Sequence, residues 1–156
     1  MKDKAWDDYM KKLGKSSFAV WRVAMYLHSK KLTVTVPALH IAGSKSEYRE
    51  FIDEGDIILH REDCKEIIEV KHQSFIFTSH DEIPWSSIIV CAKKSYDRHK
   101  VKPTAYFLVN SQLTHAIVIP SSMYEHWFEA DVYDSKKDWT QTMYRTDPNK
   151  YKFIEL

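Results

Sequence analysis

The stretch that most constrains this chain is EGDIILHREDCKEIIEVKHQ, from Glu54 to Gln73. It holds two apolar runs, Ile57–Leu59 and Ile67–Ile68 with Val70, which alternation and composition predict to be neighbouring strands. The turn between them, around Arg61–Asp63, is short enough to force the two strands together. Both runs are apolar on both faces, which is typical of central strands of a sheet.

Three charged side chains stand at the ends of these runs. Asp56 opens the first, and Glu69 and Lys71 close the second. Because side chains alternate along a strand, Glu69 and Lys71 point to one face, and strand pairing would bring Asp56 beside Glu69. An unpaired charge is costly inside a central strand, which favours a functional role for this group.

Two carboxylates and an ammonium group at one sheet edge suit a divalent metal, a water molecule and a phosphodiester. Mg²⁺ takes a few carboxylate oxygens and keeps several waters, and the metal turns one water into a nucleophile. The carbonyl of Val70 would add an oxygen ligand, and Lys71 would orient the water. The residues alone leave an alternative open, since Glu-x-Lys also occurs as an ordinary ion pair on a strand and Asp after Gly as a turn residue.

The motifs GDIIL and IEVKH resemble those of the PD-(D/E)xK nuclease superfamily. The following FTSHDEIPWSSIIVCAKKSYDR is similar to a group of small phage-encoded and bacterial proteins of that superfamily, and the resemblance covers roughly residues 32–119. It implies a restriction-endonuclease-like core, a four-stranded mixed sheet flanked by helices. It also implies Asp56 and Glu69 as ligands of Mg²⁺ or Mn²⁺, Lys71 as the catalytic lysine, and DNA as the substrate.

One feature departs from the family pattern. Many members carry a further acid on the first core helix, and the predicted helix Ser17–Lys30 has neither Asp nor Glu. Either that ligand is missing, or Glu47, Glu50 or Asp53 replaces it, with Glu50 as our candidate. Two functions therefore stay open: a metal-dependent DNA endonuclease, or a catalytically silent nuclease fold that binds DNA or a protein.

Contacts to DNA would fall to basic residues, because a net charge of +1 gives no steering field unless the 23 Lys and Arg segregate to one surface. The densest group is Lys93, Lys94, Arg98 and Lys100, in a segment that we predict to be a connector, and a solvated surface is the alternative. Lys11, Lys12, Lys15 and Arg22 form the next group. Two further substrate contacts are expected, at Gln73, which shares the face of Glu69, and in the loop 78–81.

The 156 residues predict one α+β domain with a central mixed sheet flanked by helices. The expected helices run over 4–12, ended by Gly14, and from Ser16 or Ser17, with a broad apolar stripe of Phe18, Trp21, Met25, Val20, Ala24 and Leu27 on the second. The other expected elements are strands 32–36, 75–77 and 87–91; a hairpin of 105–109 and 115–119; a helix opened by Ser122 that carries Tyr124, Trp127 and Phe128; and a last strand, 151–156.

The sequence disfavours zinc proteins, ATPases and enzymes that bind a dinucleotide. The two cysteines, Cys64 and Cys91, lack metal-ligand spacing, none of the eight His shows a zinc motif, and three Gly make no phosphate loop. A charged N-terminus and no apolar run of membrane length predict a protein of the cytoplasm, the host's if phage-encoded, without membrane contact. A homodimer is one expected assembly, with the aromatic segment Trp127–Tyr151 as its interface or as a lid.

Overall fold

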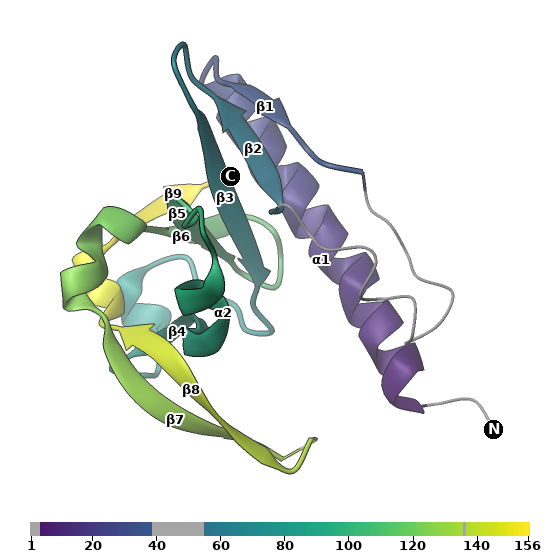
Figure 1. Ribbon diagram of the computed structural model, residues 1–156, viewed down its shortest axis with the longest axis vertical. Helices are drawn as coiled ribbons and strands as arrows, with labels where there is room; N and C mark the ends of the chain where they lie inside the picture. The colour runs from purple at the N-terminus through teal and green to yellow at the C-terminus, as the bar shows by residue number, and fades with distance from the viewer. Residues whose placement is uncertain (1–3, 39–54, 136) are drawn as a thin grey trace.

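The computed structural model describes residues 4–38, 55–135 and 137–156, with the backbone alone for 4–10 and 13. It contains two sheets and one long helix, so the predicted α+β class is confirmed (Figure 1). The main sheet has six strands in the order β1-β2-β3-β5-β6-β9, and the second has three in the order β4-β8-β7. The four-stranded sheet implied by the resemblance is therefore smaller than the one observed.

The helices and strands have the following bounds: α1 Lys4–Ser29, β1 Thr33–Thr35, β2 Ile57–His60, β3 Lys65–His72, β4 Ile88–Ala92, α2 Lys93–Arg98, β5 Ala105–Val109, β6 His115–Pro120, β7 Phe128–Asp134, β8 Trp139–Thr146 and β9 Lys152–Glu155. Short 3-10 turns lie at η2 His80–Glu82, η3 Ser121–His126 and η4 Pro148–Lys150. In the main sheet only β3 and β5 are parallel neighbours; every other pair is antiparallel.

The helix α1 covers one face of the main sheet and is a single helix where we predicted two. Gly14 does not end it, because a glycine inside a helix costs only about 1 kcal/mol. The hydroxyls of Ser16 and Ser17 donate to the carbonyls of Lys12 and Gly14, which is how serine behaves within a helix rather than at its N-cap.

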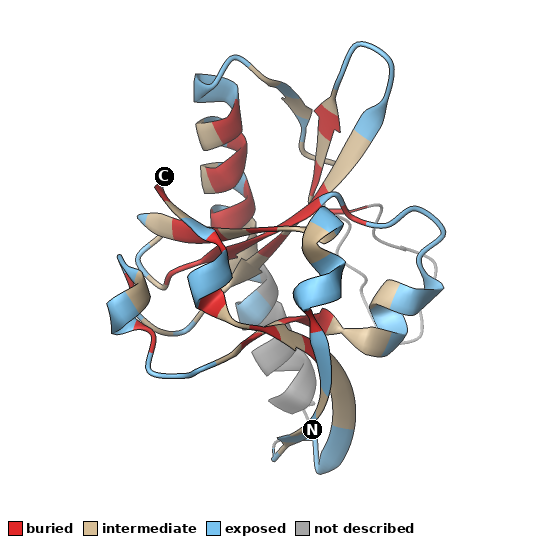
Figure 2. Cartoon of the chain, turned by 90° about the vertical axis from the view of Figure 1, so that its left-hand side faces the viewer, coloured by how far each residue is buried: buried red, intermediate tan, exposed pale blue. Residues whose placement is uncertain are grey.

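Only half of the residues predicted for the apolar stripe of α1 are buried. Its buried side is built by Ala19, Val20, Val23, Ala24 and Leu27, which pack on the strands with Ile57, Ile68 and Val70. The larger side chains of Phe18, Trp21 and Met25 are exposed, contrary to the prediction. Small and branched side chains occupy the side of α1 that faces the sheet, because they let the helix lie close to it. Figure 2 shows buried residues concentrated where α1 meets the sheet.

The opposite face of the main sheet is covered by the second sheet. The side chains of Tyr106, Leu108 and Ile117 from β5 and β6 pack against Val90 of β4 and Tyr144 of β8. The buried Asn110 closes the predicted β5–β6 hairpin, since its amide donates to the carbonyl of Phe77 and its side-chain oxygen accepts from the backbone of Thr114.

Four other sequence predictions need correction. Residues 93–98 form α2 and not a connector, and the segment opened by Ser122 is the 3-10 turn η3 with no side-chain cap. Phe75–Phe77 is irregular, because β3 ends at His72. Phe128, predicted in a helix, begins β7, and the stretch from Tyr133, where the sequence showed little periodicity, completes the hairpin β7–β8. Within the described residues, no helix is long and apolar enough to cross a membrane.

Candidate functional site

The predicted pairing of Asp56 with Glu69 is present at the start of β2. The register pairs Ile57 with Ile68, so the residue before β2 stands opposite Glu69. The Oδ2 atom of Asp56 accepts a hydrogen bond of 2.7 Å from the backbone N–H of Val70. This bond fixes one carboxylate oxygen of Asp56 against β3, beyond the point where the strand ladder of β2 begins.

Gly55 makes this close approach sterically possible. Its φ of +108° is a conformation that side chains rarely adopt, and a Cβ added there would lie 2.5 Å from Cγ2 of Ile67. The same Cβ position lies 3.9 Å from Oε1 of Glu69. The glycine therefore lets the chain enter β2 directly beside the two carboxylates.

Glu69 and Lys71 share one face of β3, as predicted, and the face is the one turned away from α1. Their neighbours on the parallel strand β5 are Tyr106 and Leu108. The Lys71 Nζ lies 3.4 Å from Oε2 of Glu69. The Glu69 side chain is only 14% exposed and that of Lys71 43% exposed, so the acid lies inside and the ammonium group reaches solvent.

The donor set suits a hard cation of the magnesium type. In a β-strand the N–H and C=O of one residue point to the same side, so the carbonyl of Val70 points toward Asp56, as its N–H does. Asp56, Glu69 and this carbonyl are all oxygen donors, and Mg²⁺ keeps several waters beside one or two carboxylates. No group of three or more His, Cys, Asp or Glu that could hold a metal occurs within the described part of the chain.

The acids proposed as substitutes for the helix ligand, Glu47, Glu50 and Asp53, lie outside the described residues. The premise of that substitution changes, because α1 begins at Lys4 and so includes Asp7 and Asp8. The first helix therefore does contain acids, in the part for which the structure describes the backbone alone.

Gln73 follows the end of β3, and its backbone N–H donates to the carbonyl of Val109 at 2.7 Å. Its side-chain amide donates to the carbonyl of Lys71 at 3.4 Å, which keeps it next to the catalytic candidates. In the loop 78–81, Thr78 donates through its backbone N–H and its hydroxyl to the carboxylate of Glu82. These bonds lower the pKa of Glu82 and fold the loop onto η2.

Cys91 brings β4 next to the candidate site. Burial raises the pKa of this thiol, and the charges of Lys71 and Glu69 also act on it. A hydrogen bond joins it to Tyr106, the neighbour of Glu69 on β5. The predicted core role of Cys91 agrees with its burial, and its position puts the end of β4, from which α2 starts, on the same side of the main sheet as Glu69.

The four predicted DNA contacts differ in their surroundings, and Lys93 is already engaged. Its Nζ lies 2.7 Å from Asp97, 3.1 Å from Glu129 and 3.1 Å from the hydroxyl of Tyr144. The bond to Asp97 is the largest cause of a raised pKa at Lys93, and the same bond lowers the pKa of Asp97. Lys93 thus fixes α2 to the second sheet.

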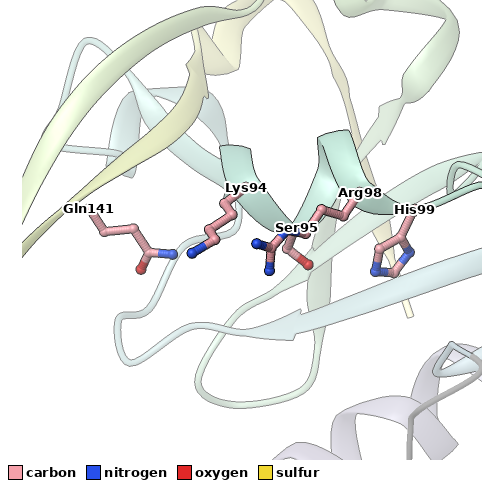
Figure 3. Close-up of a pocket in the computed structure, with 5 residues that line it drawn as sticks. All are labelled: Lys94, Ser95, Arg98, His99 and Gln141. Carbon is pink, nitrogen blue, oxygen red and sulfur yellow. The ribbon is translucent and has the colours of Figure 1, made fainter.

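Lys94 and Arg98 instead line an open pocket of about 370 Å³ between α2 and β8, whereas Lys100 lies exposed beyond α2 and outside this lining. Ser95, His99 and Gln141 complete the pocket, as Figure 3 shows. We did not predict these three. Reading 93–98 as a helix would have shown two of them, since Ser95 and His99 are four residues apart, as are Lys94 and Arg98.

Comparisons with known proteins found no relative of this chain. No protein-family model matches the chain, and neither a curated protein nor a solved structure was found to be similar to it. A function for this chain is therefore inferred from its residues, their geometry and the resemblance of its sequence motifs.

Proposed function

We propose that this protein is a metal-dependent nuclease that hydrolyses DNA phosphodiester bonds through a metal-activated water. The observation that carries the proposal is the gathering of Asp56, Glu69 and Lys71 at one edge of the main sheet, with Val70 bonded to Asp56. Unlike a solvated ion pair, this group includes a carboxylate that is largely buried. The resemblance to the PD-(D/E)xK superfamily gives these residues their roles.

In this proposal Asp56, Glu69 and the carbonyl of Val70 hold Mg²⁺ or Mn²⁺. The bound ion supplies a nucleophilic water and neutralises charge on the phosphate. Lys71 orients that water and, because its ammonium group is partly exposed, also reaches a substrate phosphate. Glu69 holds the lysine in position through the contact of 3.4 Å.

The first test measures cleavage of supercoiled plasmid and of a branched DNA with Mg²⁺, with Mn²⁺ and with EDTA. We expect metal-dependent cleavage that falls by about 100-fold to 10,000-fold in Lys71→Ala, the range for loss of a residue that assists proton transfer. Asp56→Asn should fall as far, while its side-chain oxygen still accepts from Val70 and keeps the protein folded. Lys65→Ala is the matched control, because Lys65 is an exposed lysine on the same strand.

Cleavage by Lys71→Ala at the wild-type rate would refute this site. The products also report the assembly: linear plasmid formed without accumulation of nicked circles requires two sites acting together, as in a homodimer. Nicked circles alone indicate a single site that cuts one strand.

A second candidate function is a nuclease fold that binds DNA without cutting it. The specific observation in its favour is that the described residues offer only two carboxylates at the edge, with no group of three metal-binding side chains. DNA binding in EDTA together with no products in any metal would select this candidate.

A further inference from the structure

The pocket between α2 and β8 combines features that are absent from the other cationic positions described. Its lining residues, Lys94, Ser95, Arg98, His99 and Gln141, all carry hydrogen-bond donors, and no carboxylate is among them. Within the described chain, no hydrogen bond or ion pair engages any of these five side chains. By contrast, Arg22 and Arg145 donate to backbone carbonyls, and Arg61 pairs with Glu66.

The two sides of α2 differ in charge. On the inner side Tyr96 packs against Tyr124 and Tyr144, and the hydroxyl of Tyr144 donates to Asp97 at 2.9 Å. Asp97, the one acid of this helix, is thereby directed inward toward Lys93. The outer side is left with positive charge and no neutralising partner from its own helix.

Lys94 and Arg98 are four residues apart and therefore lie on the same side of α2. Like charges at this spacing destabilise a helix, so the pair works against the fold unless an anion lies between them. Figure 3 shows Lys94, Ser95, Arg98 and His99 projecting from the same side of α2, with Gln141 reaching from β8 toward Lys94. A group with several acceptor oxygens and a negative charge matches this arrangement.

We propose that this pocket binds a phosphate group of a nucleic-acid strand, with Lys94 and Arg98 providing the charge and Ser95, His99 and Gln141 further hydrogen bonds. The assignment to nucleic acid rests on the proposed nuclease function. The pocket lies on the same side of the main sheet as Glu69 and Lys71, because β4 packs on Tyr106 and Leu108 on that face and leads directly into α2. A phosphate held in the pocket positions the strand so that a neighbouring phosphodiester bond reaches the proposed metal ligands, Asp56 and Glu69.

Binding is measured in EDTA, so that no strand is cut, by the fluorescence anisotropy of labelled single-stranded and duplex DNA over a range of salt concentrations. We expect Kd to rise about 100-fold in Lys94→Gln/Arg98→Gln, since each of the two lost hydrogen bonds to a charged group contributes roughly tenfold. The slope of log K against log salt should fall by about 0.7 on the single strand and by about 0.9 on the duplex, for the one phosphate that is no longer bound.

Two further pairs of substitutions serve as controls. Lys150→Gln/Lys152→Gln removes the same charge from exposed positions near the C-terminus and should leave the salt slope nearly unchanged. The exchange Lys94→Arg/Arg98→Lys keeps both charges and should restore the slope. A melting temperature that is unchanged or slightly higher shows that each variant folds, because neither side chain has a partner in the described chain and Lys94→Gln/Arg98→Gln removes their mutual repulsion.

The same oligonucleotide with a 5′-phosphate and with a 5′-hydroxyl identifies the source of the phosphate. A terminal monoester is the ligand if only the phosphorylated strand loses affinity in Lys94→Gln/Arg98→Gln, and internal diesters are the ligands if both strands lose it. An equal loss in the control pair, or no loss at all, overturns the pocket. The failures are separable: binding without cleavage refutes the nuclease alone, and cleavage with unchanged binding in the variant refutes the pocket alone.

Discussion

The two faces of the main sheet are built from different kinds of residue. Toward α1, the buried cluster consists of apolar side chains, among them Val23 and Leu27 of the helix and Ile68 and Val70 of β3. On the other face, the same strand β3 presents Glu69 and Lys71, which lie near the buried thiol of Cys91. One strand therefore supplies both the apolar contact that holds α1 and the charges proposed for catalysis.

This difference separates the roles of stability and chemistry along β3. Apolar burial stabilises the domain, whereas a partly buried carboxylate works against folding unless a partner compensates it. Because Ile and Val alternate with Glu and Lys along β3, the apolar side chains face α1 and the charged side chains lie together on the other face. Substitutions on the two faces should accordingly change different measured quantities.

The largest effect on stability is expected on the α1 face, at Leu27, which is 6% exposed. Leu27→Ala should lower the free energy of unfolding by about 2–5 kcal/mol, because it removes buried methyl groups and leaves a cavity. Met25→Ala on the same helix is the control, since Met25 is 61% exposed and its loss should change stability by no more than about 0.5 kcal/mol. Urea unfolding measures both.

The cleavage rate of folded Leu27→Ala should equal that of the wild type at low temperature. A cleavage rate that falls in proportion to stability would show that the two faces are not independent. Similar losses of stability at Met25 and Leu27 would contradict the observed orientation of α1.

The α1 face also shows what the sequence could and could not predict. The segment 54–73 was interpretable because short alternating runs and a tight turn act locally, and the pairing of β2 with β3 and the position of Asp56 beside Glu69 followed from it. The choice between Leu27 and Met25 as the buried side chain depends on how closely the helix approaches the sheet. That distance is set by residues far away in the chain, so periodicity alone gave too broad a stripe.

The second sheet was missed for a related reason. The hairpin β7–β8 is stabilised by the tyrosine and tryptophan contacts around Tyr144 and by pairing with β4, which lies about fifty residues earlier in the chain. Its exposed strand positions carry large apolar side chains, among them Tyr133 and Trp139, so apolar character does not mark the buried side of the hairpin. The pocket at α2 depends on this sheet, because Gln141 comes from β8. The position of Asp56 beside Glu69 was therefore predictable from sequence, and the pocket was not.

A smaller effect on stability, with a larger one on activity, is expected on the other face, at Gly55. Gly55→Ala adds a Cβ at 2.5 Å from Ile67 and forces an unfavourable φ, so it should destabilise the protein by more than about 1 kcal/mol. The strain falls where the chain enters β2, and it should displace Asp56 from Glu69. A shift of about 1 Å at such a site lowers the rate by roughly 100-fold, which plasmid cleavage measured well below the melting temperature would detect.

The same variant separates the edge from the rest of the sheet. If Gly55→Ala loses stability but cleaves at the wild-type rate, the position of Asp56 does not matter for catalysis and the proposed ligand set is wrong. Recovery of cleavage in a second-site variant that removes the clashing Cγ2 methyl, Ile67→Ala, would show that the steric clash was the cause.

The smallest effect, and one of opposite sign, is expected at Gly14, on the part of α1 that precedes its contacts with the main sheet. Among the residues that the structure describes, no neighbouring atom lies within 4 Å of the position where a Cβ would be added, and the backbone there is helical. Gly14→Ala should therefore raise the free energy of unfolding by about 0.5–1 kcal/mol, by reducing the conformational entropy of the unfolded chain. Urea unfolding measures the gain, and plasmid cleavage should stay unchanged.

A loss of stability instead would mean that another surface packs closely on Gly14, and dependence of that loss on protein concentration would identify the surface as a second copy of this chain. Gain at Gly14 and loss at Gly55 would then show that the same substitution acts through the unfolded chain at one glycine and through the geometry of the candidate site at the other.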